Sequence, residues 1–555
     1  MTDKETQKLP NAETQYDLFD HLVRIVSSTN GISLQETLEL ATNSASIKKK
    51  KEAFDLLADF RQHLSQFQQY SEDIEVLINH PVGHILREFL RKFPLPYRDE
   101  HTHLTGSLTP EFIYPRLMPL LEGPQKNLYE IGLKEVYGGQ CLPISSPEDV
   151  RELIQIKEGD RLQRYLETLY LTKLILRDRQ THRQAAYHMA KKMYENCHVG
   201  NIRLKFTFSR VSKMKAESIP GLENATPENA ILGLYEGFED FKKEHPSFGF
   251  VLSPSFKKEE GFYDSDSFAT KEEDFMNQVD TLLSLLDKYP ELQTCVTDID
   301  TVGNDTEMYR KAHFFPMQRG MRKLQQYGFH VRSHHGETWH TLNHGIQAVD
   351  NAMNIWHIDS LEHGLSLGIN PNFYLHTVFE NVREQNMEGI KLDPASPEGK
   401  EIVAMEWGKY GDIFKKLLAG ELLTDADVTH FASVKFATAI EVEHYQHDVL
   451  NRMIDQEIGL TSLPSSNRKL SGTITDFRNH PFSWWEKKGV TQAIGTDNYV
   501  TLNTDYLREM MILLLSDPKG LKITKLLMVA TGENRRPYLS KTLWDMRKQL
   551  KKEFA

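Results

Sequence analysis

The predicted fold of this chain is decided by one stretch, VRSHHGE at residues 331–337. Phe329, Val331 and Ser333 alternate with more polar neighbours, which is the period of a strand. Two histidines, a glycine and a glutamate follow directly. A neutral imidazole can bind a metal, and a carboxylate three residues further on can move protons beside it. Taken alone, the stretch favours an ordinary polar strand end, so its meaning depends on the rest of the chain.

The same pattern of a short strand followed by polar residues recurs along the chain. We expect strands at 97–104, 293–299, 329–334, 356–361, 459–463 and 490–494. Helices are expected between them at 306–327, 342–353 and near 481–488. Strands that alternate with helices indicate a parallel sheet with crossover helices. This alternation predicts an α/β fold built as a barrel.

Four of the expected strand ends carry histidines or carboxylates. In a parallel β/α barrel, the carboxyl ends of the strands form the face on which the active site lies. Histidines at positions i and i+2 of a strand point the same way and can share a metal. Three imidazole nitrogens and one carboxylate oxygen suit zinc and leave a position for water. The candidate ligands are His101, His103, His334 and Asp497.

Two further residues at these ends, Glu337 and His363, are candidates for proton transfer. Each candidate also has an ordinary structural interpretation. His363 could be a buried structural histidine, and Asp497 could cap a helix. The metal-site interpretation is favoured because all of these residues fall at strand ends in one consistent order.

The order of the motifs resembles that of the adenosine/AMP deaminase family, a branch of the amidohydrolase superfamily. HTHLTGSL at 101–108 looks like the family's HxHxxGS motif, and SHHGE at 333–337 looks like its HAGE motif, with His335 in place of alanine. LEHG at 361–364 looks like the GHG segment, and IGTDN at 494–498 looks like the NTDD motif. Residues 300–305 resemble the glycine loop before HAGE, and PSSN at 464–467 resembles the PxSN segment.

The resemblance implies a (β/α)8 TIM-like barrel with one zinc ion per chain, held by His101, His103, His334 and Asp497. It implies hydrolytic deamination of the adenine 6-amino group in a purine nucleoside or 5′-nucleotide, giving an inosine-type product and ammonia. Glu337 would share a proton with adenine N1, and His363 would orient the attacking hydroxide. Gly303 would offer its backbone to the purine.

Three positions near these motifs need separate interpretation. Asn498 stands where the family has the aspartate that meets purine N7, and an amide can still donate a hydrogen bond there. Thr105 stands where nucleoside deaminases have an aspartate for the 5′-hydroxyl, which removes repulsion toward a 5′-phosphate. Asp505 in LNTD resembles the last motif by its letters, but it precedes residues at helical spacing. We therefore expect Asp497, and not Asp505, to be the ligand.

The remainder of the 555 residues is assigned to additions on the barrel. We expect a helical N-terminal extension at 1–92, with a capping box from Ser33 to Glu36, and a deaminase barrel at 93–555. Helical insertions are expected at about 112–290 and 372–455. The first would contain helices at 160–197, 228–243 and 270–288 and a polar loop at 253–267.

Composition restricts the partners and the compartment. A net charge of −12 makes direct nucleic-acid binding unexpected, because phosphate contacts need clustered Lys and Arg. The three cysteines form no CxxC pair, which fits a reducing cytoplasm. No signal-peptide or membrane-spanning pattern is found. We expect a cytoplasmic homo-oligomer, and by analogy with bacterial relatives in anti-phage defence, a larger assembly.

Two alternatives stay open at this stage. One is a different amidohydrolase that acts on a cyclic amide; many of these use two metals and a bridging lysine or carboxylate, and we find none at a clear strand end. The other is a zinc-binding scaffold that is active only with a partner. The zinc deaminases that act on nucleic-acid bases are excluded, because the chain has no P-C-x-x-C motif.

Overall fold

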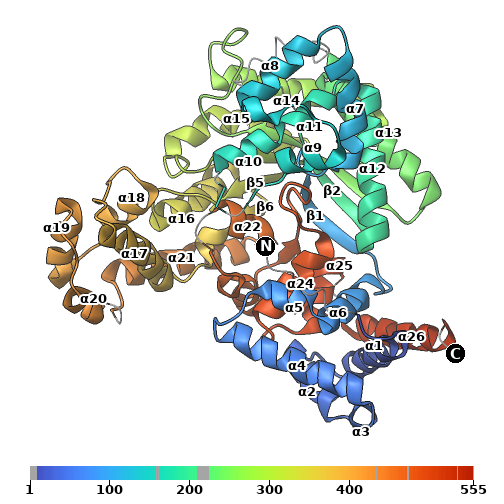
Figure 1. Cartoon of the computed structure of the whole chain (residues 1–555). Coiled ribbons are helices and arrows are strands. Elements are labelled where there is room, and N and C mark those ends of the chain that lie inside the picture. The colour runs from blue at the N-terminus through green and yellow to red at the C-terminus, as the bar shows by residue number, and fades with distance from the viewer. Residues whose placement is uncertain are drawn as a thin grey trace.

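Eight parallel strands form the centre of the molecule and follow one another in chain order around a barrel (Figure 1). The computed structural model describes residues 9–157, 159–160, 162–208, 224–431, 434–471, 474–533 and 536–553. The strands are β1 (Tyr97–His103), β2 (Val199–Thr207), β3 (Gly249–Lys257), β4 (Asp298–Val302), β5 (His330–His335), β6 (Ser360–His363), β7 (Gly459–Ser462) and β8 (Gln492–Ile494).

The barrel is closed where its first and last strands meet. A parallel bridge joins Thr102 to Asp497, and the N–H of His103 donates to the Asp497 carbonyl at 2.7 Å. The (β/α)8 fold is therefore confirmed. Within the described part of the chain, no helix combines the length and apolarity that a membrane span requires.

Alternate residues of the strands face helices and the barrel interior. On β5, Val331 and Ser333 alternate with Arg332 and His334, and all four are buried. On β6, Leu361 is followed by Glu362, and both are fully buried. Successive strand residues point to opposite sides, so an apolar set packs outward while a polar set shares the interior. This explains why alternation predicted these strands despite their many charges.

The expected insertion at 112–290 needs correction, because two barrel strands lie within it. β2 and β3 pair in register from Asn201 with Gly249 to Thr207 with Ser255. The polar loop expected at 253–267 was wrong over its first part, which is β3. Helices α7 to α11 precede β2, and α12, α13 and α14 belong to the barrel wall. These helices are α7 (Pro110–Glu122), α8 (Lys126–Tyr137), α9 (Pro147–Ile154), α10 (Leu162–Thr168), α11 (Tyr170–Ile175), α12 (Arg179–Cys197), α13 (Pro227–Glu244) and α14 (Lys271–Lys288).

Several predicted bounds shift for local reasons. The strand expected at 293–299 begins at Asp298, because residues 290–294 form a 3-10 turn. The strand expected at 356–361 begins at Ser360, because α16 (Leu342–Asn351) continues into the π-helical turn η6 (Ala352–Trp356). The helix expected at 306–327 starts later, as α15 (Phe315–Gln326). The one expected at 160–197 is divided into α10, α11 and α12.

The N-terminal helices lie against the C-terminal ones on one side of the barrel (Figure 1). The Ser33–Glu36 capping box is present at the start of α2. Arg87 makes two hydrogen bonds to Asp505, at 3.0 and 2.8 Å, and so ties α6 to α24. Residues 1–8 of the expected extension lie outside the described residues. The helices concerned are α1 (Ala12–Ser28), α2 (Leu34–Asn43), α3 (Ala45–Lys48), α4 (Lys51–Gln68), α5 (Ile74–Asn79), α6 (Pro81–Arg91), α24 (Tyr506–Ser516), α25 (Ile523–Thr531) and α26 (Arg536–Glu553).

Between β6 and β7, a group of helices projects to one side of the barrel (Figure 1). Two shorter helices lie between β7 and β8 in the chain. The projecting helices are α17 (Pro371–Met387), α18 (Pro397–Ala404), α19 (Gly411–Ala419), α20 (Asp425–Phe431) and α21 (Ala437–Asp455), and the shorter ones are α22 (Pro464–Leu470) and α23 (Phe482–Lys488).

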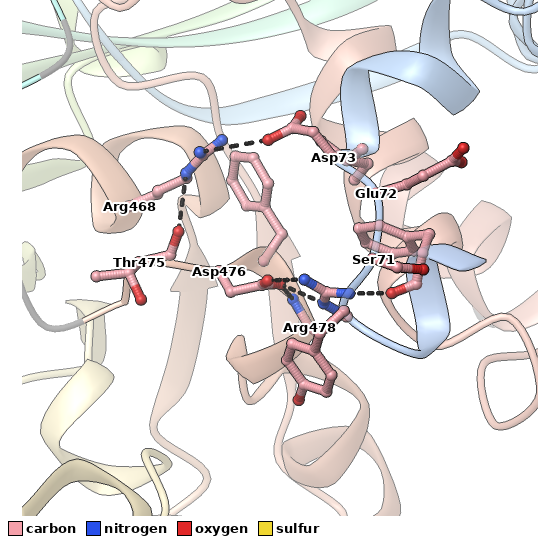
Figure 2. A pocket seen from close by; sticks show the side chains of 11 residues that line it. Ser71, Glu72, Asp73, Arg468, Thr475, Asp476 and Arg478 are labelled. Atoms are coloured by element: carbon pink, nitrogen blue, oxygen red, sulfur yellow. Dashed lines mark hydrogen bonds and ion pairs between the residues drawn. The ribbon is translucent and has the colours of Figure 1, made fainter. Parts of the chain in front are cut away.

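A cavity of about 280 Å³ lies between the N-terminal helices and the segment after α22 (Figure 2). Arg478 lies over the Tyr70 ring at 3.8 Å from its centroid and donates to the carbonyl of Phe67. Arg468 pairs with Asp73 at 3.8 Å. None of the predicted site residues lines this cavity. The contacts of Arg468 and Arg478 hold the segment between β7 and β8 against the N-terminal helices.

Candidate functional site

The four predicted metal ligands meet at the carboxyl end of the barrel. The Nε2 atoms of His101 and His103 lie 3.1 Å apart, and those of His103 and His334 lie 3.3 Å apart. The Oδ1 atom of Asp497 lies 3.6 Å from Nε2 of His103 and 3.8 Å from Nε2 of His101. Residues 101 and 497 are thus brought together by β1 and β8, which close the barrel.

These separations fit a metal ion. Ligand atoms at about 2.0–2.1 Å from a tetrahedral ion lie about 3.3 Å from one another. Imidazole nitrogens at such distances cannot all carry protons, because protons would face one another across the gap. The residues therefore fit zinc, with three nitrogens and one oxygen, and two overlapping groups of side chains could hold an ion: His101, His103 and His334, and His101, His363 and Asp497.

The far nitrogens of two of the histidines are held by buried carboxylates. Nδ1 of His101 lies 2.6 Å from Glu362, and Nδ1 of His334 lies 3.1 Å from Asp300 and 2.9 Å from the Thr301 carbonyl. An acceptor at Nδ1 takes the ring proton there and leaves the Nε2 lone pair for a metal. Burial also lowers the pKa of both rings well below the usual value, which keeps them neutral.

Below the ligands, the barrel interior is an ionic network that sequence analysis missed. Lys205 on β2 lies 2.9 Å from Asp300 and 3.4 Å from Glu362, so one ammonium joins the two carboxylates that hold ligand histidines. Although burial opposes it, Arg332 and Lys205 hold the pKa of Glu362 well below its usual range. Lys205 lies within β2 and pairs with these carboxylates, so it is not the bridging lysine at a strand end whose absence was noted from the sequence. Lys205 was overlooked because β2 itself was not predicted.

The Asp497 carboxylate is fixed by two donors besides the barrel closure. Ser466 Oγ donates to its Oδ2 at 2.5 Å, and Asn498 Nδ2 donates to its Oδ1 at 2.6 Å. Its backbone takes the left-handed region, with φ of 59°, which turns the chain sharply after β8. Asp505, by contrast, caps α24 and pairs with Arg87. The geometry thus brings Asp497, and not Asp505, to the histidines.

Glu337 and His363 form a pair beside the ligand set. Nε2 of His363 lies 3.6 Å from Oε2 of Glu337, and its Nδ1 lies 2.9 Å from Oδ1 of Asn467. Asp305 accepts the backbone N–H of Glu337 at 3.2 Å and so holds the loop after β5. Burial raises the pKa of the Glu337 carboxyl, while His363 lowers it. A carboxyl group whose pKa is raised holds its proton more readily and can pass it to a bound ligand.

The predicted substrate-contacting residues stand at the mouths of three strands. Thr105 lies in the turn after β1, and Gly303 follows β4 with φ of 116°, where a side chain would be strained. The Glu259 carboxylate approaches Gly303 and accepts the N–H of Asn304 at 2.8 Å. Asn498 is fully buried. Their contacts with substrate stay predictions.

His335, the departure from the alanine of HAGE, points away from the ligand set. Its ring packs against Phe314 and Trp356, with centroids 5.5 and 5.7 Å away. Neither of its ring nitrogens has a hydrogen-bond partner among the described residues. The His335 ring therefore fills space between the barrel and the helical turns that end at Phe314 and Trp356.

Comparison with known proteins finds likeness in structure only. No protein-family model and no curated protein matches the sequence. Among solved structures, the chain is similar to the apo N6-methyl-AMP deaminase from Arabidopsis thaliana, at 14% identity and a TM-score of 0.47 over 83% of this chain and 98% of that one. It is also similar to Arabidopsis ADAL complexed with IMP, at 14% identity and a TM-score of 0.47 over 84% of this chain and 99% of that one. A third match is a cog1816 amidohydrolase from Burkhoderia ambifaria with bound Zn, at 12% identity and a TM-score of 0.44 over 84% of this chain and 94% of that one. Likeness at this level leaves the activity to the chemistry of the site.

Proposed function

We propose that this chain is a zinc-dependent hydrolase that removes the 6-amino group of adenine in a purine nucleoside or 5′-nucleotide, with one zinc ion per chain. The observation that carries the proposal is the convergence of three Nε2 atoms and the Asp497 carboxylate beside the Glu337–His363 pair. Zinc held by His101, His103, His334 and Asp497 would supply an acidified water molecule for attack on the ring.

The residues around that position divide the remaining work. Glu337, with its raised pKa, can donate a proton to ring nitrogen N1, which makes the neighbouring C6 more electrophilic. His363 is held at Nδ1 by Asn467, so its Nε2 faces the reacting groups and can orient the attacking oxygen. Protonation of the amino group then lets ammonia leave, and a 6-oxo purine remains.

A 5′-phosphate is favoured over a free 5′-hydroxyl by Thr105. It lies directly after β1, close in sequence to the ligands His101 and His103, and it carries no charge. A carboxylate there would repel a phosphate through an unfavourable Coulomb interaction. We therefore propose nucleotides as the preferred substrates.

The test is ammonia release, with the product identified by mass, from adenosine, deoxyadenosine, AMP, dAMP, ATP and dATP, together with the zinc content of the protein. We expect deamination of adenine compounds and one zinc per chain. Glu337→Gln is expected to keep zinc and lose at least about 100-fold in kcat, as is typical of removing a general acid. Near-normal activity of this variant would overturn the proton role of Glu337.

The metal count separates this proposal from the cyclic-amide alternative. Lys205 stands in a strand, but it pairs with Asp300 and Glu362 and is not directed at the ligand set as a bridging group would be. Two metal ions per chain, with hydrolysis of cyclic amides and none of adenine compounds, would replace our proposal by that alternative. One zinc without turnover of any adenine compound would support a scaffold.

A further inference from the structure

A tyrosine from the helices between β1 and β2 reaches the candidate site. Tyr165 belongs to α10 and accepts a hydrogen bond from Nδ2 of Asn498, 333 residues away in the chain. Its ring packs against a small apolar cluster that is separate from the main core, made by Ile156, Leu470 and Leu502. Two of these three residues follow β7 and β8, so the ring is held between α10 and the loops that position Asp497.

Asn498 has no hydrogen-bond donor left for a ligand. One N–H of its amide is used by Tyr165 and the other by Oδ1 of Asp497, at 2.6 Å. Its Oδ1 atom packs against Gly106, where an added Cβ would lie only 1.9 Å away, and it has no partner in the described part of the chain. Purine N7 is an acceptor and needs a donor, and both N–H donors of Asn498, the residue that the sequence suggests for this contact, are already used by its neighbours.

The hydroxyl group of Tyr165, unlike the amide of Asn498, still has a proton to donate. Since its oxygen accepts from Asn498, its own proton is available for donation. No acceptor for that proton is found among the described residues. Burial raises the pKa of Tyr165 well above its usual value, and the nearby charges of Asp497 and Glu337 add to this, so the phenol keeps its proton at neutral pH.

Adenine presents an acceptor where this proton can be used. In the purine ring, C6 is flanked by N1 on one side and, through C5, by N7 on the other. Glu337 contacts His363, and Tyr165 is joined to Asp497 through Asn498. With Glu337 at N1, N7 needs a second donor, and the Tyr165 hydroxyl has a proton that no described residue accepts.

We propose that Tyr165 donates its hydroxyl proton to N7 of the adenine ring, and that Asn498 is a positioning residue that fixes the phenol and Asp497 together. This inference rests on the proposed deaminase function and names the ring contact within it. Loss of the donor leaves N7 without a partner in the site, and an unpaired buried acceptor costs about 10-fold to 100-fold in binding or rate.

The experiment compares two proteins on two rings. Wild type and Tyr165→Phe are assayed for kcat/KM on adenosine and AMP, and on their 7-deaza analogues, in which carbon replaces N7. We expect the variant to lose about 10-fold to 100-fold on the natural rings and less than about 3-fold on the 7-deaza rings. Taking the ratio of the two losses cancels the different intrinsic reactivity of the rings.

Tyr499→Phe is the matched control. Like Tyr165→Phe, it removes one tyrosine hydroxyl, here from the residue that follows Asn498. The Tyr499 hydroxyl is buried without a hydrogen-bond partner among the described residues. We expect equal rates on each ring before and after this change. Zinc content and thermal unfolding of each variant confirm that the site is intact.

Three outcomes would contradict the role of Tyr165. An equal loss on natural and 7-deaza rings would make Tyr165 a purely structural residue and overturn the inference while leaving the deaminase intact. No loss on either ring would overturn it as well. A wild-type protein that holds zinc but deaminates no adenine compound would overturn the proposed function and this inference together.

Discussion

Glu401 on α18 makes the stability of the protein depend on pH. One of its oxygens, Oε2, accepts both the N–H of Leu342 at 2.8 Å and the hydroxyl of Tyr374 at 3.1 Å. Leu342 is the first residue of α16, so this carboxyl anchors the helix that follows the β5 loop with Glu337. Burial raises the pKa of Glu401 from 4.5 to about 7.

The sign and size of the effect follow from this pKa. The folded protein binds a proton at Glu401 that the unfolded chain releases between pH 4.5 and about 7, so the free energy of unfolding falls as pH rises through this window. One pKa unit corresponds to about 1.4 kcal/mol, which gives a total of about 3 kcal/mol. About 2.5 kcal/mol of it falls between pH 5 and pH 8.5.

Glu401→Gln removes this dependence. The amide oxygen can accept the same two hydrogen bonds, since both go to one oxygen, and it has no proton to release. In urea unfolding, we expect the free energy of unfolding of the variant, relative to that of wild type, to rise by about 2.5 kcal/mol from pH 5 to pH 8.5. All other titrating groups are common to both proteins and cancel in the difference. A difference that stays constant across this range would refute the assignment of a raised pKa to Glu401.

Three further changes test the site. Asp497→Ala is expected to lose zinc and activity, whereas Asp505→Ala should cost about 1–2 kcal/mol of stability as a lost helix cap and keep its zinc; metal analysis showing the reverse would mean that the wrong aspartate was chosen. Lys205→Met should weaken zinc binding about 10-fold to 100-fold in competition with a chelator, because the carboxylates behind His101 and His334 lose their shared cation, and unchanged affinity would contradict that role. Thr105→Asp should shift the ratio of kcat/KM toward adenosine and away from AMP by about 10-fold, and an unchanged ratio would show that Thr105 does not face the 5′ position.

The residues that converge at the candidate metal site could be predicted from sequence because they stand where strands end. His101, His103, His334 and Asp497 each follow or close a short strand, and parallel strands bring such ends to one face. The predicted strand limits were wrong by a few residues at β4 and β6, yet the side chains at the ends were assigned to the correct face. The position of a donor at a strand end depends on topology more than on where the strand begins.

Strands β2 and β3 and the residue Tyr165 could not be predicted in the same way. β2 was missed because Arg203 and Lys205 give it the appearance of a polar segment, although both charges are paired inside the barrel. β3 was read as a loop because Ser253, Pro254 and Ser255 are typical of turns. Tyr165 lies in a helix without any motif, and its contact with Asn498 is set by packing between distant segments, which no local pattern contains.

The barrel closes where the candidate metal ligands of β1 and β8 meet, and this sets the order in which they become available during synthesis. His101 and His103 leave the ribosome about 400 residues before Asp497, which completes both the ligand set and the junction of β1 with β8. At about 5–20 residues per second, the two early histidines wait for tens of seconds without their last partner. The nascent chain therefore cannot bring all four candidate metal ligands together until nearly all of these 555 residues have been made.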